Sequence, residues 1–390
     1  MTRLLHTADW QIGRQYGSFD PDDAVPLAEA RYAAVERIAA MAQAEQVDAV
    51  LVAGDVFDAQ TVSARSIRRL FNALQAFAGP WVMIPGNHDA ALAESVWTHA
   101  QRLAVVPPNV HLALTAGVIA LPQARLACLC APLTQRHTHG DLTAWFDTAA
   151  TPEGWHRVGL AHGAVQGLLA EGIDAANPIA PDRAERANLS YLALGDWHGT
   201  RRIDARTWYS GTPEPDRFRN NEAGQALLVQ LGQLGEPGTA LQVQPLRTAQ
   251  FAWQQHSATL QVPSDLDALL AQLAALGAAD VLELTVAGAL DVAAHTRLLQ
   301  ALGETEARVR CLRRDLGALS LAPTEADLAA LQADGYLGEL ITELRTTTGE
   351  DARRAQDALA MLTGLLAARP AAEAAATRTA GAAAPTGSAA

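Results

Sequence analysis

The amino-acid sequence predicts an α/β protein followed by a smaller α+β module. In residues 1–245, short apolar runs alternate with stretches of helical periodicity, which is typical of a sheet whose strands are buried on both faces. Polar and charged side chains gather where those runs end, at the edge where open α/β sheets bind ligands. After about residue 250 the pattern changes to that of a separate, smaller module.

The strands expected in the first domain are short and almost wholly apolar. They are Arg3–Thr7, Asp48–Ala53, Trp81–Ile84, Arg125–Cys130, Val158–Ala161, Tyr191–Leu194 and Arg206–Ser210. Two helices, Leu27–Gln46 and Ala64–Phe77, are predicted between the first three strands. A stretch rich in Gly, Pro and Gln, from Gln230 to Pro245, predicts a closing hairpin and a domain boundary.

The second module is predicted to alternate strand, helix, strand, helix and strand. These elements are Ala258–Val262, Asp265–Leu276, Val281–Val286, Ala293–Leu302 and Val309–Leu312. Two more helices are expected at Thr324–Arg345 and Asp351–Ala368. The tail is rich in Ala, Thr, Gly and Ser, which form no core, and is predicted to be disordered. The predicted domains are therefore 1–245, 250–320 and 324–368, followed by the tail at 370–390.

Composition favours a cytoplasmic protein without membrane attachment. No apolar run reaches the roughly 18 residues that a membrane helix needs, and Met1–Trp10 lacks the apolar core of a signal peptide. The cysteines, Cys128, Cys130 and Cys311, form no CxxC pair and are interpreted as inert thiols in a reducing compartment. A net charge of -13 argues against non-specific attachment to nucleic acid, although bound metals or a partner could supply positive charge.

Five short segments carry polar side chains directly after predicted strands. They are TADWQ (Asp9, Gln11), GDVFD (Asp55, Asp58), GNHD (Asn87, His88), LAHG (His162) and GDWHG (Asp196, His198). Each segment alone is a weak signal, because matches of this length occur by chance. Their order at successive strand ends is a strong one.

These residue types suit the hydrolysis of a phosphodiester. The reaction needs a nucleophile at neutral pH and a sink for phosphoryl charge, and two divalent metals about 3.5–4 Å apart supply both. One carboxylate must bridge the metals, and Asp55 at its tight Gly-Asp turn is placed to do so. Asp9 and Gln11 are two residues apart, which puts both on one side of an extended segment. The same holds for Asp196 and His198.

At these segments the chain resembles the calcineurin-like metallophosphoesterases, and more narrowly their DNA-repair exonuclease branch, the SbcD and YhaO type of nuclease subunit. The resemblance covers most of residues 1–245, including the TPEP stretch from Thr212 to Pro215. It implies a sheet sandwich flanked by helices and a two-manganese site, and the layout of the module after residue 250 is compatible with the capping domain of that branch. It also implies 3′-to-5′ exonuclease action on DNA in a repair complex. An SMC-like ATPase partner would dock on the helices at 324–368, although packing of these helices on the protein's own module is equally compatible with the sequence.

The resemblance also assigns roles to residues. One metal would be held by Asp9, Gln11, Asp55 and His198, and the other by Asp55, Asn87, His162 and Asp196. His88 would protonate or stabilise the leaving oxygen, with Asp58 orienting its ring. Arg201 and Trp197 are the candidates for substrate binding, through phosphate contact and base stacking, although a solvated Arg201 and a packed Trp197 are equally compatible with the sequence.

Two positions depart from the family pattern. Gln11 stands where the family has a His, and Asp196 replaces the first His of its GHxH segment. A Gln oxygen can bind metal but is a weaker donor than imidazole, or it could merely hydrogen-bond a ligand or a water. Three carboxylates on two dications favour Mn²⁺, with Mg²⁺ as the alternative. They also weaken Lewis acidity, which predicts an alkaline-shifted activity optimum.

Other polar and aromatic residues have a structural interpretation. His6 lies three residues before Asp9 and would face the opposite side of the strand, which favours packing. His137 and His139 form an HxH pair in a polar loop, where solvation is the plainer interpretation. Trp10 either stacks on bases or packs in the core.

Three functions are compatible with the sequence. The leading one is a metal-dependent DNA exonuclease. The second is a phosphodiesterase or phosphatase for nucleotides or another small phosphoester, although the module after residue 250 favours a polymeric substrate. The third is a non-catalytic scaffold with an altered metal site that binds DNA or a partner ATPase.

Overall fold

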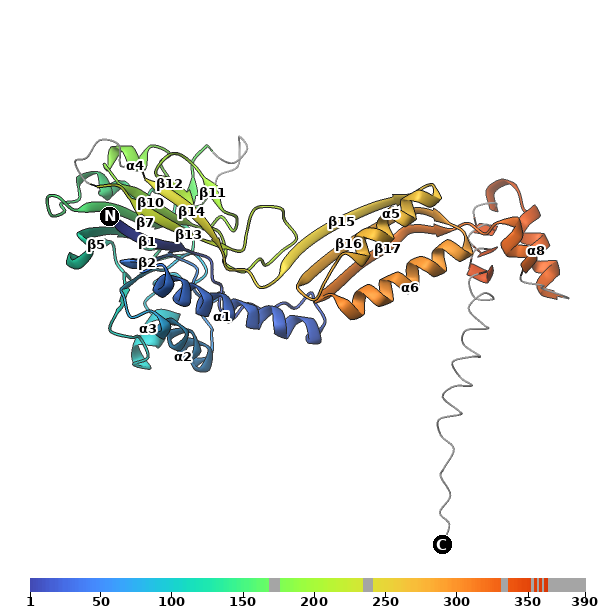
Figure 1. Cartoon of the computed structure of the whole chain (residues 1–390), viewed down its shortest axis with the longest axis horizontal. Helices are drawn as coiled ribbons and strands as arrows, with labels where there is room; N and C mark the ends of the chain where they lie inside the picture. The colour runs from blue at the N-terminus through green and yellow to red at the C-terminus, as the bar shows by residue number, and fades with distance from the viewer. Residues whose placement is uncertain are drawn as a thin grey trace, which may run out of the picture. The chain divides into compact units, whose positions relative to one another are not determined.

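The first part of the chain folds into two six-stranded sheets with helices on their outer faces, in a computed structural model (Figure 1). The structure describes residues 1–167, 176–233, 241–330, 336–351, 354–355, 358–359 and 361–363. The chain divides into two compact units, the first ending at Trp253 and the second beginning at Gln254. The α/β class and the sheet sandwich flanked by helices are confirmed.

The first sheet has the spatial order β14-β13-β1-β2-β3-β4. Its strands are β1 (Thr2–Thr7), β2 (Ala49–Ala53), β3 (Trp81–Ile84), β4 (Val110–Leu112), β13 (Gln225–Leu231) and β14 (Gln242–Arg247). Strands β1 to β4 are parallel, and β13 pairs with β1 antiparallel. Helices α1 (Pro21–Ala44), α2 (Ala64–Ala73) and α3 (Val96–Arg102) cover one face. Leu5 packs toward these helices and Leu4 toward the second sheet, so β1 is apolar on both faces.

The second sheet has the order β11-β12-β10-β7-β6-β5. Its strands are β5 (Gly117–Leu121), β6 (Leu126–Ala131), β7 (His156–His162), β10 (Tyr191–Gly195), β11 (Arg201–Arg202) and β12 (Thr207–Tyr209). Its outer face packs on the short helices η3 (Ala144–Thr148) and α4 (Arg183–Arg186). Cys128 is buried between the two sheets, where burial raises the pKa of its thiol to about 12. This agrees with the expectation of inert thiols.

All seven predicted strands of the first unit are present, each within two residues of its expected ends. Helix α1 begins six residues before the predicted Leu27, at Pro21, because Pro21 suits the first helical turn and Asp22 and Asp23 favour the N-terminus. Helix α3 and strands β4 and β5 were not expected. The predicted hairpin is formed by β13 and β14, while residues 234–240 of that stretch lie outside the described residues.

The second unit contains a three-stranded sheet in the order β15-β16-β17. Its elements are β15 (Ala252–Leu260), α5 (Pro263–Ala274), β16 (Asp280–Leu290), α6 (Val292–Arg308) and β17 (Cys311–Leu321), which confirms the predicted alternation. Leu269 of α5 and Leu298 of α6 pack with Leu284 of β16. The helix predicted at 324–345 is described as α7 (Glu325–Ala330) and α8 (Tyr336–Thr346). Residues 331–335, most of 351–368 and the tail at 370–390 lie outside the described residues.

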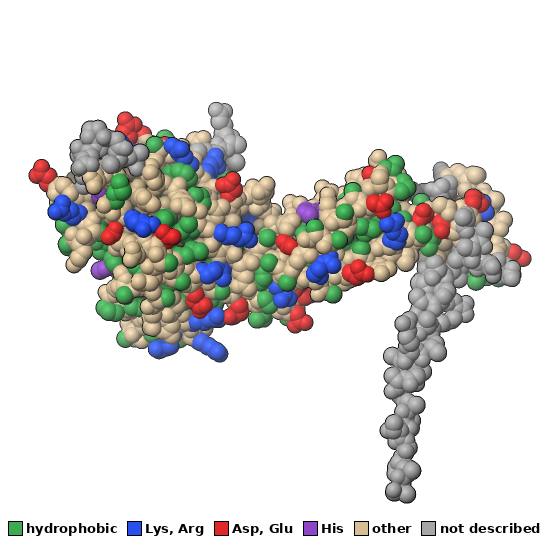
Figure 2. All heavy atoms as spheres, viewed as in Figure 1, with side chains coloured by type: hydrophobic (Ala, Val, Ile, Leu, Met, Phe, Trp, Pro, Cys, Tyr) green, Lys and Arg blue, Asp and Glu red, His purple; other side chains and the backbone are tan. Residues whose placement is uncertain are grey.

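Charged side chains of both signs are spread over the face seen in Figure 2, where arginines alternate with aspartates and glutamates. This face therefore offers mixed charge instead of a basic band. Across the described residues, no helix has the length and apolar character needed to cross a membrane.

Candidate metal centre

The candidate residues leave the two sheets at the carboxyl ends of parallel strands. In the first sheet, Asp9 and Gln11 follow β1, Asp55 follows β2, and Asn87 follows β3. In the second sheet, His162 ends β7, and Asp196 and His198 follow β10. Because the strands of each group run parallel, their side chains reach one edge of each sheet.

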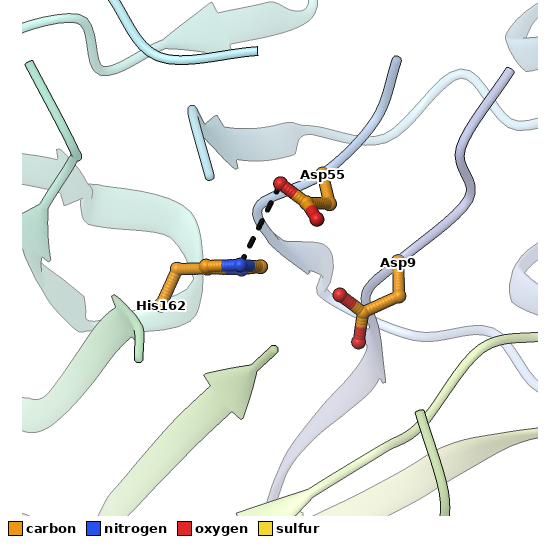
Figure 3. Close-up of side chains that lie close together, drawn as sticks. All are labelled: Asp9, Asp55 and His162. Atoms are coloured by element: carbon orange, nitrogen blue, oxygen red, sulfur yellow. Dashed lines mark ion pairs between the residues drawn. The ribbon is translucent and has the colours of Figure 1, made fainter. Parts of the chain in front are cut away.

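Asp9, Asp55 and His162 form the middle of the site, where their side chains point toward one another (Figure 3). All three are buried, and one ligand atom of each lies within 4.8 Å of those of the other two. Asp55 Oδ1 is 3.5 Å from His162 Nε2, while Nδ1 of the same ring is 2.8 Å from the carbonyl oxygen of Ala53. A carbonyl only accepts, so Nδ1 carries a proton and Nε2 faces the carboxylates.

Asn87 and Asp196 both lie close to His162. Asn87 Oδ1 is 2.9 Å and Asp196 Oδ1 is 3.8 Å from His162 Nε2. The backbone N–H of Asp196 donates to Asp9 Oδ1 at 3.1 Å. The four residues expected to share one metal, Asp55, Asn87, His162 and Asp196, are therefore neighbours.

Gln11 and His198 are adjacent to each other. Gln11 Nε2 is 3.2 Å from His198 Nε2, and Gln11 Oε1 accepts a hydrogen bond from Arg14 Nη1 at 2.5 Å. On the far side of its ring, His198 Nδ1 lies 3.1 Å from Asp216 Oδ2. Sequence reasoning missed Asp216 as the residue that orients His198. The available signal was its place directly after the TPEP stretch.

Four of the proposed ligands have a left-handed backbone. Their φ angles are +55° at Asp9, +44° at Gln11, +51° at Asp55 and +100° at Asp196. Such angles are uncommon for residues other than glycine and gather at functional sites. The expectation of extended ligand segments is therefore wrong, because the chain turns sharply after β1 and after β10. The side chain of Asp55 also requires a glycine at position 86, after β3, since a Cβ there would lie 2.2 Å from Asp55 Oδ1.

His88 lies beside Asp55, and its ring contacts Asp58. Its backbone N–H donates to Asp55 Oδ1 at 2.9 Å, and its Nε2 is 3.9 Å from Asp55 Oδ2. The ring nitrogen Nδ1 is 2.8 Å from the main-chain carbonyl oxygen of Asp58. The carboxylate of Asp58 instead faces Arg14, with Oδ1 3.5 Å from Nη1. Asp58 therefore contacts the ring of His88 through its main chain and not through its carboxylate.

Asp89 is a second residue that sequence reasoning missed. Its buried carboxylate accepts the N–H of Gly86 at 2.6 Å and the N–H of Phe57 at 3.1 Å. It thereby ties together the loops that carry Asn87 and Asp55. Burial, reinforced by the charge of Asp55, raises the pKa of Asp89 to about 7. Its position as the last residue of GNHD was the available signal.

Negative charge dominates the site. Burial raises the pKa of Asp9 to about 6 and also raises that of Asp196. Burial alone would lower the pKa of His162, but the carboxylates of Asp55, Asp9 and Asp196 raise it to about 9. A divalent cation would relieve the repulsion among these carboxylates. Oxygen donors with imidazole nitrogens suit Mn²⁺ or Mg²⁺, so the residues present fit such an ion.

The remaining expectations concern residues around the site. Trp197 is 36% exposed, and the guanidinium carbon of Arg201 lies 5.0 Å from the centre of its ring. Trp10 is buried and packs edge-on against Trp81, so it belongs to the core. His6 is buried with Nδ1 2.9 Å from the hydroxyl of Tyr191, which confirms packing. The side chains of His137 and His139 are exposed, as expected.

The N-terminal part of the chain matches a family of known proteins. Residues 2–171 match the family described as calcineurin-like phosphoesterase. The chain contains a calcineurin-like phosphoesterase domain. The matched phosphoesterase segment includes Asp9, Gln11, Asp55, Asn87, His88 and His162, whereas Asp196, His198 and Asp216 follow it.

Three relatives are similar to parts of the chain. The SbcD component of the SbcCD nuclease from Rhodobacter capsulatus is 43% identical over 94 residues, 23% of this chain and 22% of that protein. The protein of the same name from Bacillus subtilis is 27% identical over 268 residues, 58% of this chain and 65% of that protein. DNA double-strand break repair protein Mre11 of Methanosarcina acetivorans is 27% identical over 244 residues, 56% of this chain and 35% of that protein. The chain spans less than two thirds of each relative. These matches confirm the resemblance to calcineurin-like phosphoesterases over residues 2–171, and the names of the relatives agree with the repair-nuclease branch of that family.

Proposed function

We propose that this chain is a metal-dependent DNA exonuclease that degrades DNA in the 3′-to-5′ direction as part of a repair complex. One observation carries the proposal. Asp9, Asp55 and His162, which come from strands of two different sheets, bring their ligand atoms within 4.8 Å of one another in a phosphoesterase domain. The names of the relatives, components of a nuclease and a double-strand break repair protein, support DNA as the substrate. The direction of cleavage rests on the family resemblance.

We assign two divalent ions to the site, Mn²⁺ or Mg²⁺. Asp9, Gln11, Asp55 and His198 would hold the first ion, and Asp55, Asn87, His162 and Asp196 the second. Bound ions would supply an activated water and a sink for the charge on the phosphoryl oxygens. The three carboxylates among these ligands favour manganese and an alkaline activity optimum.

His88 is the proposed general acid. Its side chain is 30% exposed, so a substrate can reach it. With Nδ1 bonded to the carbonyl of Asp58, Nε2 is left to deliver a proton to the leaving oxygen. Nε2 lies 3.9 Å from Asp55 Oδ2, so the proposed donor stands next to the proposed metal centre.

Trp197 and Arg201 are proposed to contact the substrate. The exposed indole of Trp197 offers a face for base stacking. Arg201 lies over that ring and carries the charge that a phosphate requires. Both follow Asp196 closely in the sequence, so DNA held there would lie next to the ligands of the second ion.

The proposal includes an SMC-like ATPase partner. In it, the second unit acts as a capping module for a polymeric substrate, and helices α7 and α8 dock on the coiled coil of the ATPase. We place the complex in the cytoplasm, where buried thiols such as Cys128 stay reduced.

A manganese-dependent nuclease assay tests this function. Wild type, Asp55→Asn and Gln11→His are compared on linear duplex DNA labelled at either end, on cyclic nucleotides, and on bis(4-nitrophenyl) phosphate. We expect the wild type to remove nucleotides from 3′ ends, Asp55→Asn to lose activity, and Gln11→His to retain or gain it. Preference for cyclic nucleotides would indicate a small-substrate phosphodiesterase. Manganese binding without cleavage of any substrate would indicate a scaffold.

A further inference from the structure

Arg14 lies at the edge of the metal centre and is held by three side chains. Its Nη1 donates to Gln11 Oε1 at 2.5 Å, and its Nη2 is 3.2 Å from Asp216 Oδ2. Nη1 is also 3.5 Å from Asp58 Oδ1. The side chain is 23% exposed, so the guanidinium is fixed in place yet open to solvent on one side.

This arginine determines how the amide of Gln11 is turned. A guanidinium has only donors, so the oxygen of Gln11 faces Arg14 and its NH₂ group faces His198 Nε2 at 3.2 Å. The Nε2 atom then accepts, and Nδ1 donates to Asp216. Arg217 Nη2, a donor, also lies 3.0 Å from Nδ1. Because the ionised carboxylate of Asp216 is a strong acceptor, we place the proton of the ring on Nδ1, in the bond with Asp216. A cation would bind to Gln11 Oε1 and His198 Nε2. Each of these atoms already faces a hydrogen-bond donor of the protein.

We propose that Arg14 opposes the ion at Asp9, Gln11 and His198, so that the two metal positions bind with unequal affinity. An ion on Gln11 Oε1 would lie beside a positive charge that contacts the same oxygen, and like charges repel strongly at this range. Among the described contacts, no arginine pairs with Asn87, His162 or Asp196. The ion at those residues therefore binds first. This inference rests on the two-metal function proposed above.

The same contact links metal binding to the substrate. Guanidinium groups bind phosphate through two parallel hydrogen bonds, so a phosphate in the site competes with Gln11 for Arg14. Release of Gln11 Oε1 frees a ligand for the weaker ion. Because coupling between two bound ligands is reciprocal, phosphate and the weaker ion each strengthen the binding of the other. The resting protein holds one ion and takes up the other together with substrate.

Manganese titration by calorimetry, supported by electron paramagnetic resonance of free Mn²⁺, tests this inference. Wild type is expected to bind one ion tightly and the other with an affinity at least about tenfold lower. Arg14→Gln should tighten the weaker site by about tenfold, whereas Arg14→Lys keeps the charge and should not. Arg69→Gln is the matched control, because it removes the same charge from an exposed pair with Glu29. Added dAMP should tighten the weaker site of the wild type.

The outcomes separate this inference from the function on which it rests. The role of Arg14 would be overturned if the two ions bound with equal affinity, or if Arg14→Gln did not raise the affinity of the weaker site. The two-metal function would still stand. Absence of any manganese binding would defeat the function itself. If Arg14→Gln fails to fold, the wild-type titration with dAMP decides, since an unchanged weaker site would refute the coupling.

Discussion

Asp216 Oδ2 lies 3.1 Å from His198 Nδ1 and 3.2 Å from Arg14 Nη2, so one buried carboxylate orients both a proposed ligand and the cation that opposes the ion. Burial alone would raise the pKa of Asp216. The hydrogen bond with His198 and the guanidinium groups of Arg217 and Arg31 instead hold that pKa well below its usual range. Asp216 is therefore ionised throughout the pH range of any plausible assay, and its charge keeps His198 Nε2 turned toward the site.

Loss of this charge should weaken metal binding. We expect Asp216→Asn to lower manganese affinity about 10–100-fold, the usual cost of removing a partner that orients a ligand. Calorimetry measures the change. Asp204→Asn is the control, because Asp204 is an exposed carboxylate that bonds only within its own turn. Equal affinity in wild type and Asp216→Asn would show that Asp216 does not position His198.

Asp216 should also stabilise the fold in a pH-dependent manner. Its folded pKa lies below the usual value of 3.8, so its ionised form contributes stability above that pH. The contribution is lost as pH falls below that value toward the folded pKa. Urea unfolding should show a difference between wild type and Asp216→Asn that is constant from about pH 5 to 8 and shrinks below about pH 4. A difference that grows as the solution is acidified would reverse the predicted sign.

Asp89→Asn should loosen two ligand loops together. The carboxylate accepts the N–H groups of Gly86 and Phe57, whereas an amide would turn its own donor toward one of them. We expect unfolding free energy to fall by about 1–3 kcal/mol and manganese affinity to drop. Chemical denaturation and calorimetry measure the two effects. Asp204→Asn makes the same substitution in an exposed carboxylate that accepts two backbone N–H groups through one oxygen, and it should affect neither metal binding nor activity.

His88→Asn should separate proton donation from metal binding. On DNA the variant is expected to lose about 10²–10⁴-fold in kcat, because the leaving oxygen needs a proton. On bis(4-nitrophenyl) phosphate the loss should be small, since nitrophenolate leaves without one. Manganese affinity should match that of the wild type. An equal loss on both substrates would point to a role in positioning instead of acid catalysis.

Metal binding should release a proton from His162. In the metal-free protein the pKa of His162 is about 9, so at neutral pH its ring is protonated. An ion that binds Nε2 displaces this proton, and apparent manganese affinity should therefore rise with pH up to about 9. Calorimetry in two buffers of different ionisation enthalpy counts the protons. Affinity that does not change between about pH 6 and 9 would mean that His162 is not a ligand.

Much of the fold was predictable because its signals are local. The strands are short apolar runs, and Asp55, Asn87 and His162 each follow or end one of them. Parallel strands deliver such residues to one edge, so strand ends alone predicted which side chains would meet. The predicted start of α1 was wrong because the first turn, from Pro21, precedes the apolar periodicity on which the prediction depended.

The supporting residues were not predictable in the same way, because their roles arise from contacts that neither residue type nor position after a strand reveals. Asp216 reaches back 18 residues to His198, and Arg14 is an ordinary cation until its bond to Gln11 is seen. The contact of His88 with Asp58 uses a main-chain carbonyl, which the residue type does not reveal. The left-handed angle at Asp9 has no glycine beside it to announce the turn.

The central claim is that two divalent ions share the carboxylate of Asp55. Anomalous diffraction at the manganese edge, from crystals soaked in Mn²⁺ and dAMP, tests it most directly. The claim predicts two peaks, one on each side of that carboxylate, and the loss of at least one of them in Asp55→Asn. A wild-type crystal saturated with manganese and showing no peak within ligand distance of Asp55 would contradict it.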